Sequence, residues 1–490
     1  MADESRALLS DPTPPISLQR EDGNHPSHGA HAAGDIEMRQ MGGAGGGAAH
    51  APHEDHHHAT AYERAEAERA HFCDMSFRAN LEGFVKLLRS NLILACLLVF
   101  VPIGIVCGIQ DWGAELTFLF NFIAIIPLAW LIGQSTEDLA AHTGQIVGGL
   151  LNASFGNVIE ALLCFWGLYH NQVLVVQCTL VGSILSNLLL VMGTAFFAGG
   201  YYFKLQEYSA LGAVTNTSLL TLSCLCLVLP TMYAYILSSE VDAELAISRG
   251  VSILLAALYA QYLYFQLSTH SFMFAEDDQA ADNNKAILPP QLQQQQRPQQ
   301  DGVVVPNGQQ QNGDVVEEAD DAGEGEEEED EVMMPCPGAT MLLAVATVIT
   351  AVCSEFLIDS IQGVVDQCNL SREFIGIILL PIIGNAAEHY TAISVAMRNK
   401  MDLSLGVAVG SSCQMALFVT PLAVLMGWCL NVPMTLNFHP FQVTMLLLST
   451  LVVTGVLQDG HSNWLEGSML LTAYVAIALI YWFEEPYNQL

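Results

Sequence analysis

Long apolar runs separated by short polar connections make up most of the chain after residue 90. A helix needs about 17 to 25 mainly apolar residues to cross the hydrocarbon core of a bilayer. Runs of this length predict an all-α polytopic membrane protein with eleven transmembrane helices, grouped as six and then five. The predicted spans are 92–109, 116–133, 148–169, 173–199, 210–237, 246–267, 340–361, 375–397, 403–427, 441–457 and 465–483.

Two long polar segments flank the first group of spans. Residues 1–75 are rich in Gly, Ala, Pro, His and acidic residues, which predicts a disordered cytosolic N-terminal arm. Residues 76–109 are interpreted as an amphipathic lead-in and the first span. Residues 270–335 form an acidic cytosolic linker, which is either simply solvated or uses the acid run Glu324–Glu331 to attract cations near the pore.

Composition supports insertion into a membrane. The chain is 52% hydrophobic and 13% charged, and its net charge of -35 is concentrated in the two polar segments. Most of the 12 cysteines lie in apolar runs and are interpreted as small buried hydrophobic residues. The tract His53–His58 has no fixed geometry to organise metal ligands, so a solvated tract is favoured over a metal site.

The basic residues predict the orientation. Of the 15 lysine and arginine residues, all except Arg249 and Arg372 fall on the side of the N-terminus when the predicted spans are threaded through a membrane. Positive residues favour the cytosolic side. We therefore expect a cytosolic N-terminus and linker and, because the number of spans is odd, a lumenal C-terminus.

A sequence motif occurs twice inside the apolar runs. Gly156–Glu160 and Gly384–Glu388 both read Gly-Asn-x-x-Glu, and the offset between them also places Gly182–Ser183 on Gly410–Ser411. Two separate motifs that repeat in register indicate duplication of a whole unit.

The duplication predicts an inverted repeat. A short insertion in the second copy brings Thr136–Leu139 alongside Ser354–Leu357, so repeat 1 is 116–267 (spans 2–6) and repeat 2 is 340–483 (spans 7–11). Matching spans are separated by an odd number of crossings and therefore run in opposite directions. Two inverted five-helix repeats plus one extra N-terminal span are typical of secondary transporters, whose substrate site lies near the midplane.

The repeated residues favour a cation site. Carboxylates in mid-membrane are costly, so Glu160 and Glu388 are predicted to bind a cation, although a carboxylic acid hydrogen-bonded between helices is the alternative. Asn157 and Asn385 lie three residues earlier, on the same helix faces. Oxygen ligands without convergent Cys or His favour Ca2+, with Mn2+ as a second candidate. Ca2+ is therefore the expected transported substrate, and no cofactor is expected.

Exchange follows from the same two carboxylates. Glu160 and Glu388 match the charge of one divalent ion, and when that ion leaves, desolvation and mutual repulsion favour protonation. Gly156, Gly384 and Pro381 are expected to break the helices and release backbone carbonyls. Other small polar residues either add oxygen ligands or serve helix packing: Ser183, Ser186, Ser411, Ser412 and Gln414.

Further acidic and basic side chains lie near the predicted site. Glu137, Asp138 and Glu355 occur at span ends or just inside them, and Glu137 and Glu355 are assigned to a gate or entrance because they recur in both copies. His389 either relays protons or packs between helices.

At these residues the chain resembles the cation/proton exchanger family, the vacuolar Ca2+/H+ antiporters of the Ca2+/cation antiporter superfamily. The resemblance is carried by Gly148–Glu160, Pro381–His389 and Asn399–Ser412. It implies an eleven-span plan, cation binding by the motif glutamates and asparagines, proton-driven loading of a vacuole, and an N-terminal segment that can be autoinhibitory. The chain departs from the usual pattern at Val158-Ile159, Tyr390 and Cys413, which bears on ion selectivity.

Competing interpretations remain distinguishable. A Na+-coupled exchanger of the same superfamily would require sodium, and a Ca2+ channel or sensor would use the acid run rather than paired intramembrane carboxylates. An enzyme is not expected, because no matched nucleophile and base occur. The expected partners are Ca2+, protons and membrane lipid, without nucleic acid, and a homo-oligomer is compatible with the sequence.

Overall fold

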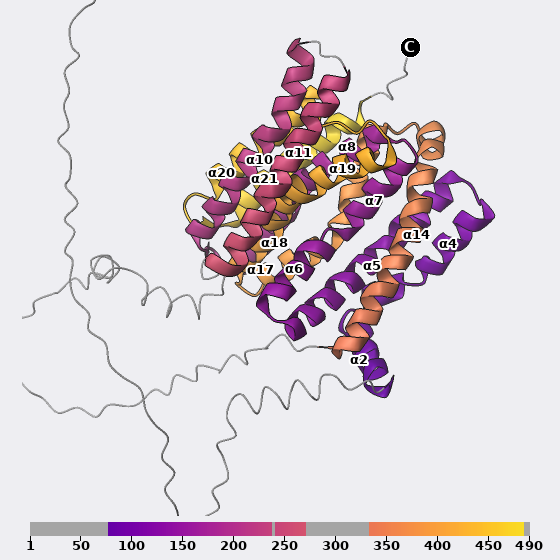
Figure 1. The fold of residues 1–490 in the computed structure, drawn as a ribbon. Coiled ribbons are helices and arrows are strands. Elements are labelled where there is room, and N and C mark those ends of the chain that lie inside the picture. Colours follow the sequence, from indigo (N-terminus) through magenta and orange to yellow (C-terminus); the bar gives the residue numbers. More distant parts are fainter. Residues whose placement is uncertain (1–76, 238–240, 271–332, 485–490) are drawn as a thin grey trace, which may run out of the picture. The chain divides into compact units, whose positions relative to one another are not determined.

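The computed structural model describes residues 77–237, 241–270 and 333–484. These residues are mostly helical, as predicted for a membrane-type fold (Figure 1). The N-terminal arm, the acid run and nearly all of the linker lie outside the described residues, so the predictions about them are untested.

Helices follow one another through both halves of the sequence. In the first half they are α2 Phe77–Ser90, α3 Leu92–Leu97, α4 Phe100–Gln110, α5 Ala114–Thr143, α6 Gln145–Phe155, α7 Val158–Tyr169, α8 Val173–Leu185, η1 Ser186–Val191, α9 Met192–Tyr202, α10 Ala210–Leu237, α11 Val241–Tyr264 and η2 Phe265–Thr269. In the second half they are α14 Cys336–Cys368, α15 Arg372–Phe374, η4 Ile375–Leu379, α16 Leu380–Gly384, α17 Ala386–Ala396, α18 Met401–Gln414, η5 Met415–Val419, α19 Thr420–Leu430, α20 Pro440–Val456 and α21 Trp464–Trp482. The η elements are π-helical segments that continue the neighbouring α-helices.

Length and apolarity identify the helices that suit a membrane. Within the described residues, 8 helices are long and apolar enough to cross one, or up to 10 if each of two bent pairs is one span. The shorter apolar helix α20 is additional. Many outward-facing side chains on these helices are large and apolar, for example Leu254, Met341 and Val348, which are 71%, 70% and 65% exposed. Such a surface suits lipid rather than water.

The helices extend beyond the apolar runs that predicted them. Helix α5 continues to Thr143, ten residues past the predicted end of that span. Its polar residues stay helical because their hydroxyls are satisfied within the helix: Ser135 Oγ donates to Leu131 O at 2.6 Å, and Thr136 Oγ1 donates to Ile132 O at 2.8 Å. Hydropathy alone therefore underestimates helix length where polar residues face inward.

Two helices are broken where the repeated motif occurs. The pair α6–α7 bends by 42° at Gly156-Asn157, and the pair that ends in α16 and continues as α17 bends by 55° at Asn385. The breaks coincide with the motif glycines, and Pro381 lies in the first turn of α16. Each motif asparagine therefore lies at the start of a new helix.

Helices from the two halves of the sequence pack together. Helix α14 lies along α5 for much of its length (Figure 1), and a buried apolar cluster that includes Ile125, Leu128, Leu357 and Ile361 joins them. The largest buried cluster links α8, η1 and α9 to α18, η5 and α19. The broken helices lie between these two groups.

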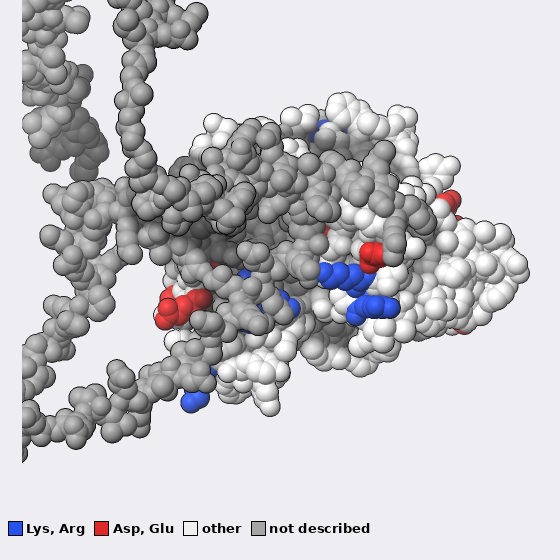
Figure 2. Space-filling model, turned by 90° about the horizontal axis from the view of Figure 1, so that it is seen from below, with Lys and Arg blue, Asp and Glu red and all other residues white. Residues whose placement is uncertain are grey.

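One end of the helices is named here the linker end, because α14 begins there. The α5–α6 turn at Gly144 and the α9–α10 connection also lie at this end. The α9–α10 connection contains β1 Gln206–Glu207, which pairs antiparallel with β2 His461–Ser462 between α20 and α21. The all-helical prediction missed this small ladder. Figure 2 views the linker end and shows lysine and arginine side chains together with aspartate and glutamate side chains among uncharged residues.

Candidate functional site

The two breaks are joined to helices of the opposite half by matching hydrogen bonds. Ser411 Oγ in α18 donates to Asn157 Oδ1 at 3.2 Å. Ser183 Oγ in α8 donates to Asn385 Oδ1 at 3.3 Å. All four residues are at least nine-tenths buried. The serines and asparagines that recur in the sequence therefore also meet in space, each asparagine with the serine of the other copy.

The surroundings of the two asparagines differ in detail. Asn157 Nδ2 donates to the side chain of Gln414, whereas Asn385 Nδ2 donates to the backbone oxygen of Ser183 at 3.2 Å. Asn187 of η1 donates from Nδ2 to Ser411 Oγ at 3.0 Å. The network around Asn157 is therefore larger than the network around Asn385.

Each motif glutamate lies in the first turn of the helix that follows its break. Glu160 is fully buried, and neither of its carboxylate oxygens has a hydrogen-bond partner among the described residues. A side chain added at Gly384 would place its Cβ 2.6 Å from Glu160 Oε1, so the break of the second half lies directly against this carboxylate. A larger residue there would require the carboxylate of Glu160 to shift. Glu388 Oε2 is also buried without a hydrogen-bond partner among the described residues.

A cavity of about 360 Å³ reaches this region. Asn157 and Gln414 line it from one side and Gly384 and Glu388 from another, whereas Glu160 and Asn385 do not line it. Other lining residues lie near helix ends at the linker end, so the cavity opens toward that end; they include Glu137, Ser209, Gln266 and Asp402.

The acidic residues predicted at an entrance separate into different environments. Glu137 lines the cavity, and Gln134 Nε2 donates to its Oε2 at 3.2 Å. Asp138 points elsewhere: it is 3% exposed, and its Oδ1 accepts a hydrogen bond from Met333 N at 3.1 Å. Asp138, which was noted at a span end without being assigned to the entrance, anchors the chain that leads into α14. Glu355 does not line the cavity.

The other residues predicted at the site also divide into those that line the cavity and those that do not. Gly156 lines the cavity, but Ser183, Ser186, Ser412 and His389 do not. Ser412 Oγ donates to Ala408 O at 2.9 Å within its own helix, and His389 Nδ1 lies 3.1 Å from Asn385 O. These contacts match the packing interpretations of Ser412 and His389.

Several polar residues of the site were missed from the sequence. Tyr262 in α11 donates its hydroxyl to Asn216 Oδ1 in α10 at 3.2 Å, and both residues line the cavity. Asp402 accepts a hydrogen bond from Ser209 N at 2.7 Å and also lines it. Neither Asn216 nor Tyr262 belongs to a motif that occurs twice in the sequence. The sequence signal for Asp402 was an acidic residue directly before the predicted span 403–427, after Asn399-Lys400-Met401.

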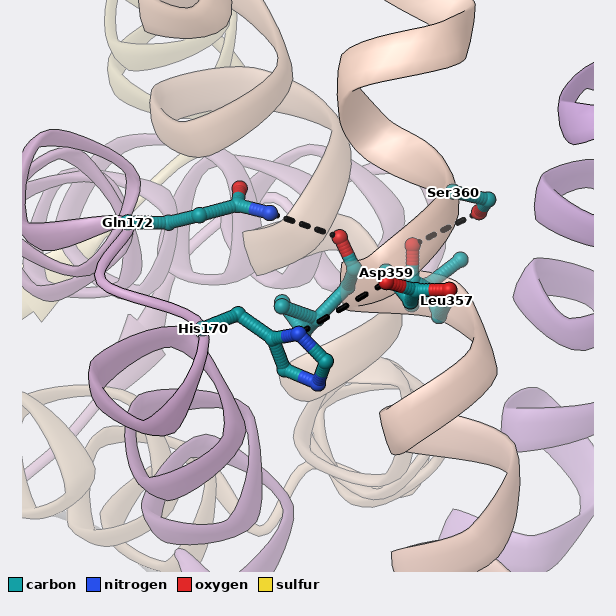
Figure 3. Close-up of polar contacts among 6 residues, drawn as sticks. His170, Gln172, Leu357, Asp359 and Ser360 are labelled. Carbon is teal, nitrogen blue, oxygen red and sulfur yellow. Dashed lines mark hydrogen bonds and ion pairs between the residues drawn. The ribbon is translucent and has the colours of Figure 1, made fainter.

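At the opposite end, α7 and α14 are tied together (Figure 3). His170 Nδ1 lies 3.6 Å from Asp359 Oδ1, and Gln172 Nε2 donates to Ile358 O at 3.0 Å. Since α7 carries Glu160, these contacts connect the helix of the first carboxylate to α14. The described cavity does not reach them.

This fold and this polar centre define an ion-exchanger class of membrane transporter. The sequence profile described as "Sodium/calcium exchanger protein" matches residues 114–268 and 338–483, and the chain belongs to that family. The matched ranges contain both broken helices and every cavity residue named above.

Similar proteins sharpen the family assignment. The chain is 38% identical over 400 residues to a "Ca(2+)/H(+) antiporter" of Aphanothece halophytica, covering 81% of this chain and 98% of that one. It is 40% identical to "Vacuolar cation/proton exchanger 3" of Oryza sativa subsp. japonica, covering 81% and 89%. It is 33% identical to a "Vacuolar calcium ion transporter" of Schizosaccharomyces pombe, covering 82% and 88%. The resemblance to cation/proton exchangers is thereby confirmed.

Solved structures agree at the level of the fold. The structure titled "Structure of native YfkE" has a TM-score of 0.63 and 30% sequence identity, covering 80% of this chain and 100% of that chain. "Crystal Structure of H+/Ca2+ Exchanger CAX" has a TM-score of 0.55 at 13% identity, covering 81% and 92%, and supports the fold alone.

Proposed function

We propose that this chain is a secondary active transporter that exchanges Ca2+ for protons and loads an acidic, vacuole-like compartment. The observation that carries the proposal is the pair of motif glutamates, one from each half, at crossed asparagine–serine contacts: Glu160 is fully buried, and Glu388 lines the cavity. Similar proteins bear names that include Ca2+/H+ antiporter and vacuolar cation/proton exchanger. Mn2+ is a second candidate substrate because it also accepts oxygen ligands.

We count eleven spans for this function. Each bent pair is taken as one span, and α20 is taken as a short span, in addition to the eight long helices. The inverted repeats are then 116–267 and 340–483, and matching helices run in opposite directions. In this proposal the linker end faces the cytosol, as the distribution of basic residues predicts. Arg249 is one of the two basic residues predicted on the opposite side of the membrane. Its guanidinium stacks over Trp428, 4.6 Å from the ring centroid, near the end of α19 that is remote from the linker end, which supports this orientation.

Each site residue has a role in this proposal. Glu160 and Glu388 bind Ca2+ or protons in turn, because a carboxylate in a poorly solvated site is neutral when protonated and attracts a cation when ionised. The amide oxygens of Asn157 and Asn385 complete the oxygen ligands. Glu137 attracts cations at the cytosolic mouth, and Glu355 takes the equivalent role when the opposite side is open.

The direction of the cavity fits uptake from the cytosol. In the described conformation Asn157 and Glu388 line the cavity that opens toward the linker end, and this cavity does not reach the contact between His170 and Asp359 at the opposite end. By the inverted repeat, the alternate conformation exposes Glu160 and Asn385 to the lumen. One site is then exposed to each side in turn, which is what exchange without leak requires.

Vesicle transport tests the proposal. Purified protein is reconstituted into vesicles with a preset pH gradient, and Ca2+ uptake is recorded together with dissipation of the gradient. Wild-type protein should couple the two, Glu160→Gln and Glu388→Gln should each abolish both, and Glu115→Gln, on the exposed first turn of α5, should retain both. Full coupled transport in either site variant would overturn the assignment. Uptake that requires Na+ and ignores the pH gradient would instead establish the sodium-coupled alternative.

A further inference from the structure

Helix α2, which precedes the first apolar helix, has two different faces. Gly83 and Leu87 are buried on one face, with Leu87 0% exposed. Leu81, Val85 and Arg89 follow one another at four-residue spacing on the other face and are exposed. Because residues four apart lie on the same side of a helix, the exposed apolar pair and the arginine form one stripe.

The buried face is fixed against the start of the second half. A Cβ added at Gly83 would lie 2.7 Å from Met333 O, and Leu87 packs in one cluster with Met334 and Leu343. Met333 is itself held by Asp138 of α5. The packed face leaves α2 little freedom to rotate, so the exposed stripe keeps its direction.

The exposed stripe combines apolar and basic side chains. Leu81 is 49% exposed and Val85 is 37% exposed, and both line a surface hollow with Glu82, Lys86 and Arg89. Glu82 and Lys86 lie on the same flank of the helix, one turn apart, and Arg89 continues the line of the two apolar residues. Apolar residues beside cations are typical of helices that lie in the interface of a membrane.

The stripe is continuous along the chain with an apolar helix. Only the turn at Asn91 separates α2 from α3, where Leu92 and Ile93 are 67% and 78% exposed. Since α3 and α4 together form one of the helices apolar enough to cross a membrane, α2 is held where the headgroups of one leaflet begin. A tethered helix needs little additional affinity to stay bound.

We propose that the Leu81–Val85–Arg89 face of α2 binds anionic phospholipid headgroups of the leaflet at the linker end. Leu81 and Val85 insert between the upper parts of the acyl chains, and Lys86 and Arg89 contact the phosphates. The proposal is independent of which ion the protein moves.

Accessibility of position 85 tests this directly. Full-length Val85→Cys protein is reconstituted into vesicles of phosphatidylcholine alone or with phosphatidylserine, and the rate of labelling by a membrane-impermeant maleimide is measured. Phosphatidylserine should slow labelling at least severalfold, because each basic side chain near an anionic surface contributes roughly a fivefold preference. Lys86→Gln/Arg89→Gln in the same background should remove the difference. The charge-matched control Arg398→Gln/Lys400→Gln, at the linker end but outside α2, should keep it.

Each other outcome overturns the proposal. Equal labelling in both lipids would place the stripe in water, and equal slowing by both lipids would leave no role for charge. The N-terminal arm is the alternative occupant. If deletion of residues 1–75 alone accelerates labelling in neutral detergent, the arm rather than lipid covers the stripe. Native cysteines are controlled by the same protein with Val85 intact.

Discussion

The two broken helices carry the same motif but present different atoms to the cavity. In the first half the amide of Asn157 lines the cavity and the carboxylate of Glu160 is sealed behind Gly384. In the second half Glu388 lines the cavity and Asn385 is withdrawn against Ser183. Equivalent sequences therefore occupy inequivalent positions, which agrees with the proposed inverted repeat. In the proposed transport cycle, this difference marks the side to which the site is open.

The largest effect should come from filling the contact between the two halves. Gly384→Ala would force a methyl group against Glu160 Oε1, and crowding of a packed interior costs about 1–3 kcal/mol. We expect coupled Ca2+ uptake to fall by roughly tenfold or more. Gly250→Ala in α11 is the matched control, because an added Cβ there meets nothing within 4 Å, and its uptake should stay at the wild-type level. Normal uptake by Gly384→Ala would show that the two halves do not meet there during exchange.

The two asparagines should respond differently to the same change. Asn157→Ala removes a ligand that faces the cavity, so it should raise the KM for Ca2+ severalfold. Asn385→Ala removes a contact behind the cavity, and a lost buried hydrogen bond costs about 1–3 kcal/mol, so it should mainly lower thermal stability. The measurements are uptake kinetics and thermal unfolding in detergent. If both substitutions raised the KM for Ca2+ equally, the proposed difference between the two asparagines would be wrong.

Substitution of Asp138 should change the stability of the protein rather than its transport of Ca2+. Asp138→Ala leaves the Met333 N–H without its acceptor, which should lower the free energy of unfolding by about 1–3 kcal/mol. Asp138→Asn keeps an oxygen in place and should recover most of that loss. Thermal unfolding of the three proteins, with the KM for Ca2+ as a second readout, checks this. A large rise in KM with unchanged stability would mean that Asp138 acts in transport rather than as an anchor.

The smallest effect concerns the contact between α7 and α14 at the end opposite the linker end. His170 Nδ1 lies 3.6 Å from Asp359 Oδ1, and Asp359 is 70% exposed. Exposed pairs contribute about 0.2–1 kcal/mol. A double-mutant cycle with His170→Gln and Asp359→Asn should give a coupling of this size that high salt weakens, because salt screens exposed charges. Coupling that is independent of salt would mean that packing, rather than charge, joins α7 to α14 there.

The sequence predicted the helical membrane fold and the approach of the two motifs because the same residues occur in both copies and their polar side chains need partners inside an apolar environment. It could not predict which residue of each copy lines the cavity, since the motif is the same in both. Asn216 and Tyr262 escaped notice because one asparagine and one tyrosine in long apolar helices carry no periodic signal. The role of Asp138 depends on Met333, which is 195 residues away along the chain.

The short ladder between β1 and β2 has a mechanical consequence. Gln206, which belongs to β1, also donates from Nε2 to Ala396 O at 2.9 Å and to Asn399 Oδ1 at 3.0 Å. Three connections that follow α9, α17 and α20 are thereby fastened to one another. If these helices were to slide past one another at this end, the ladder or the hydrogen bonds of Gln206 would have to break first.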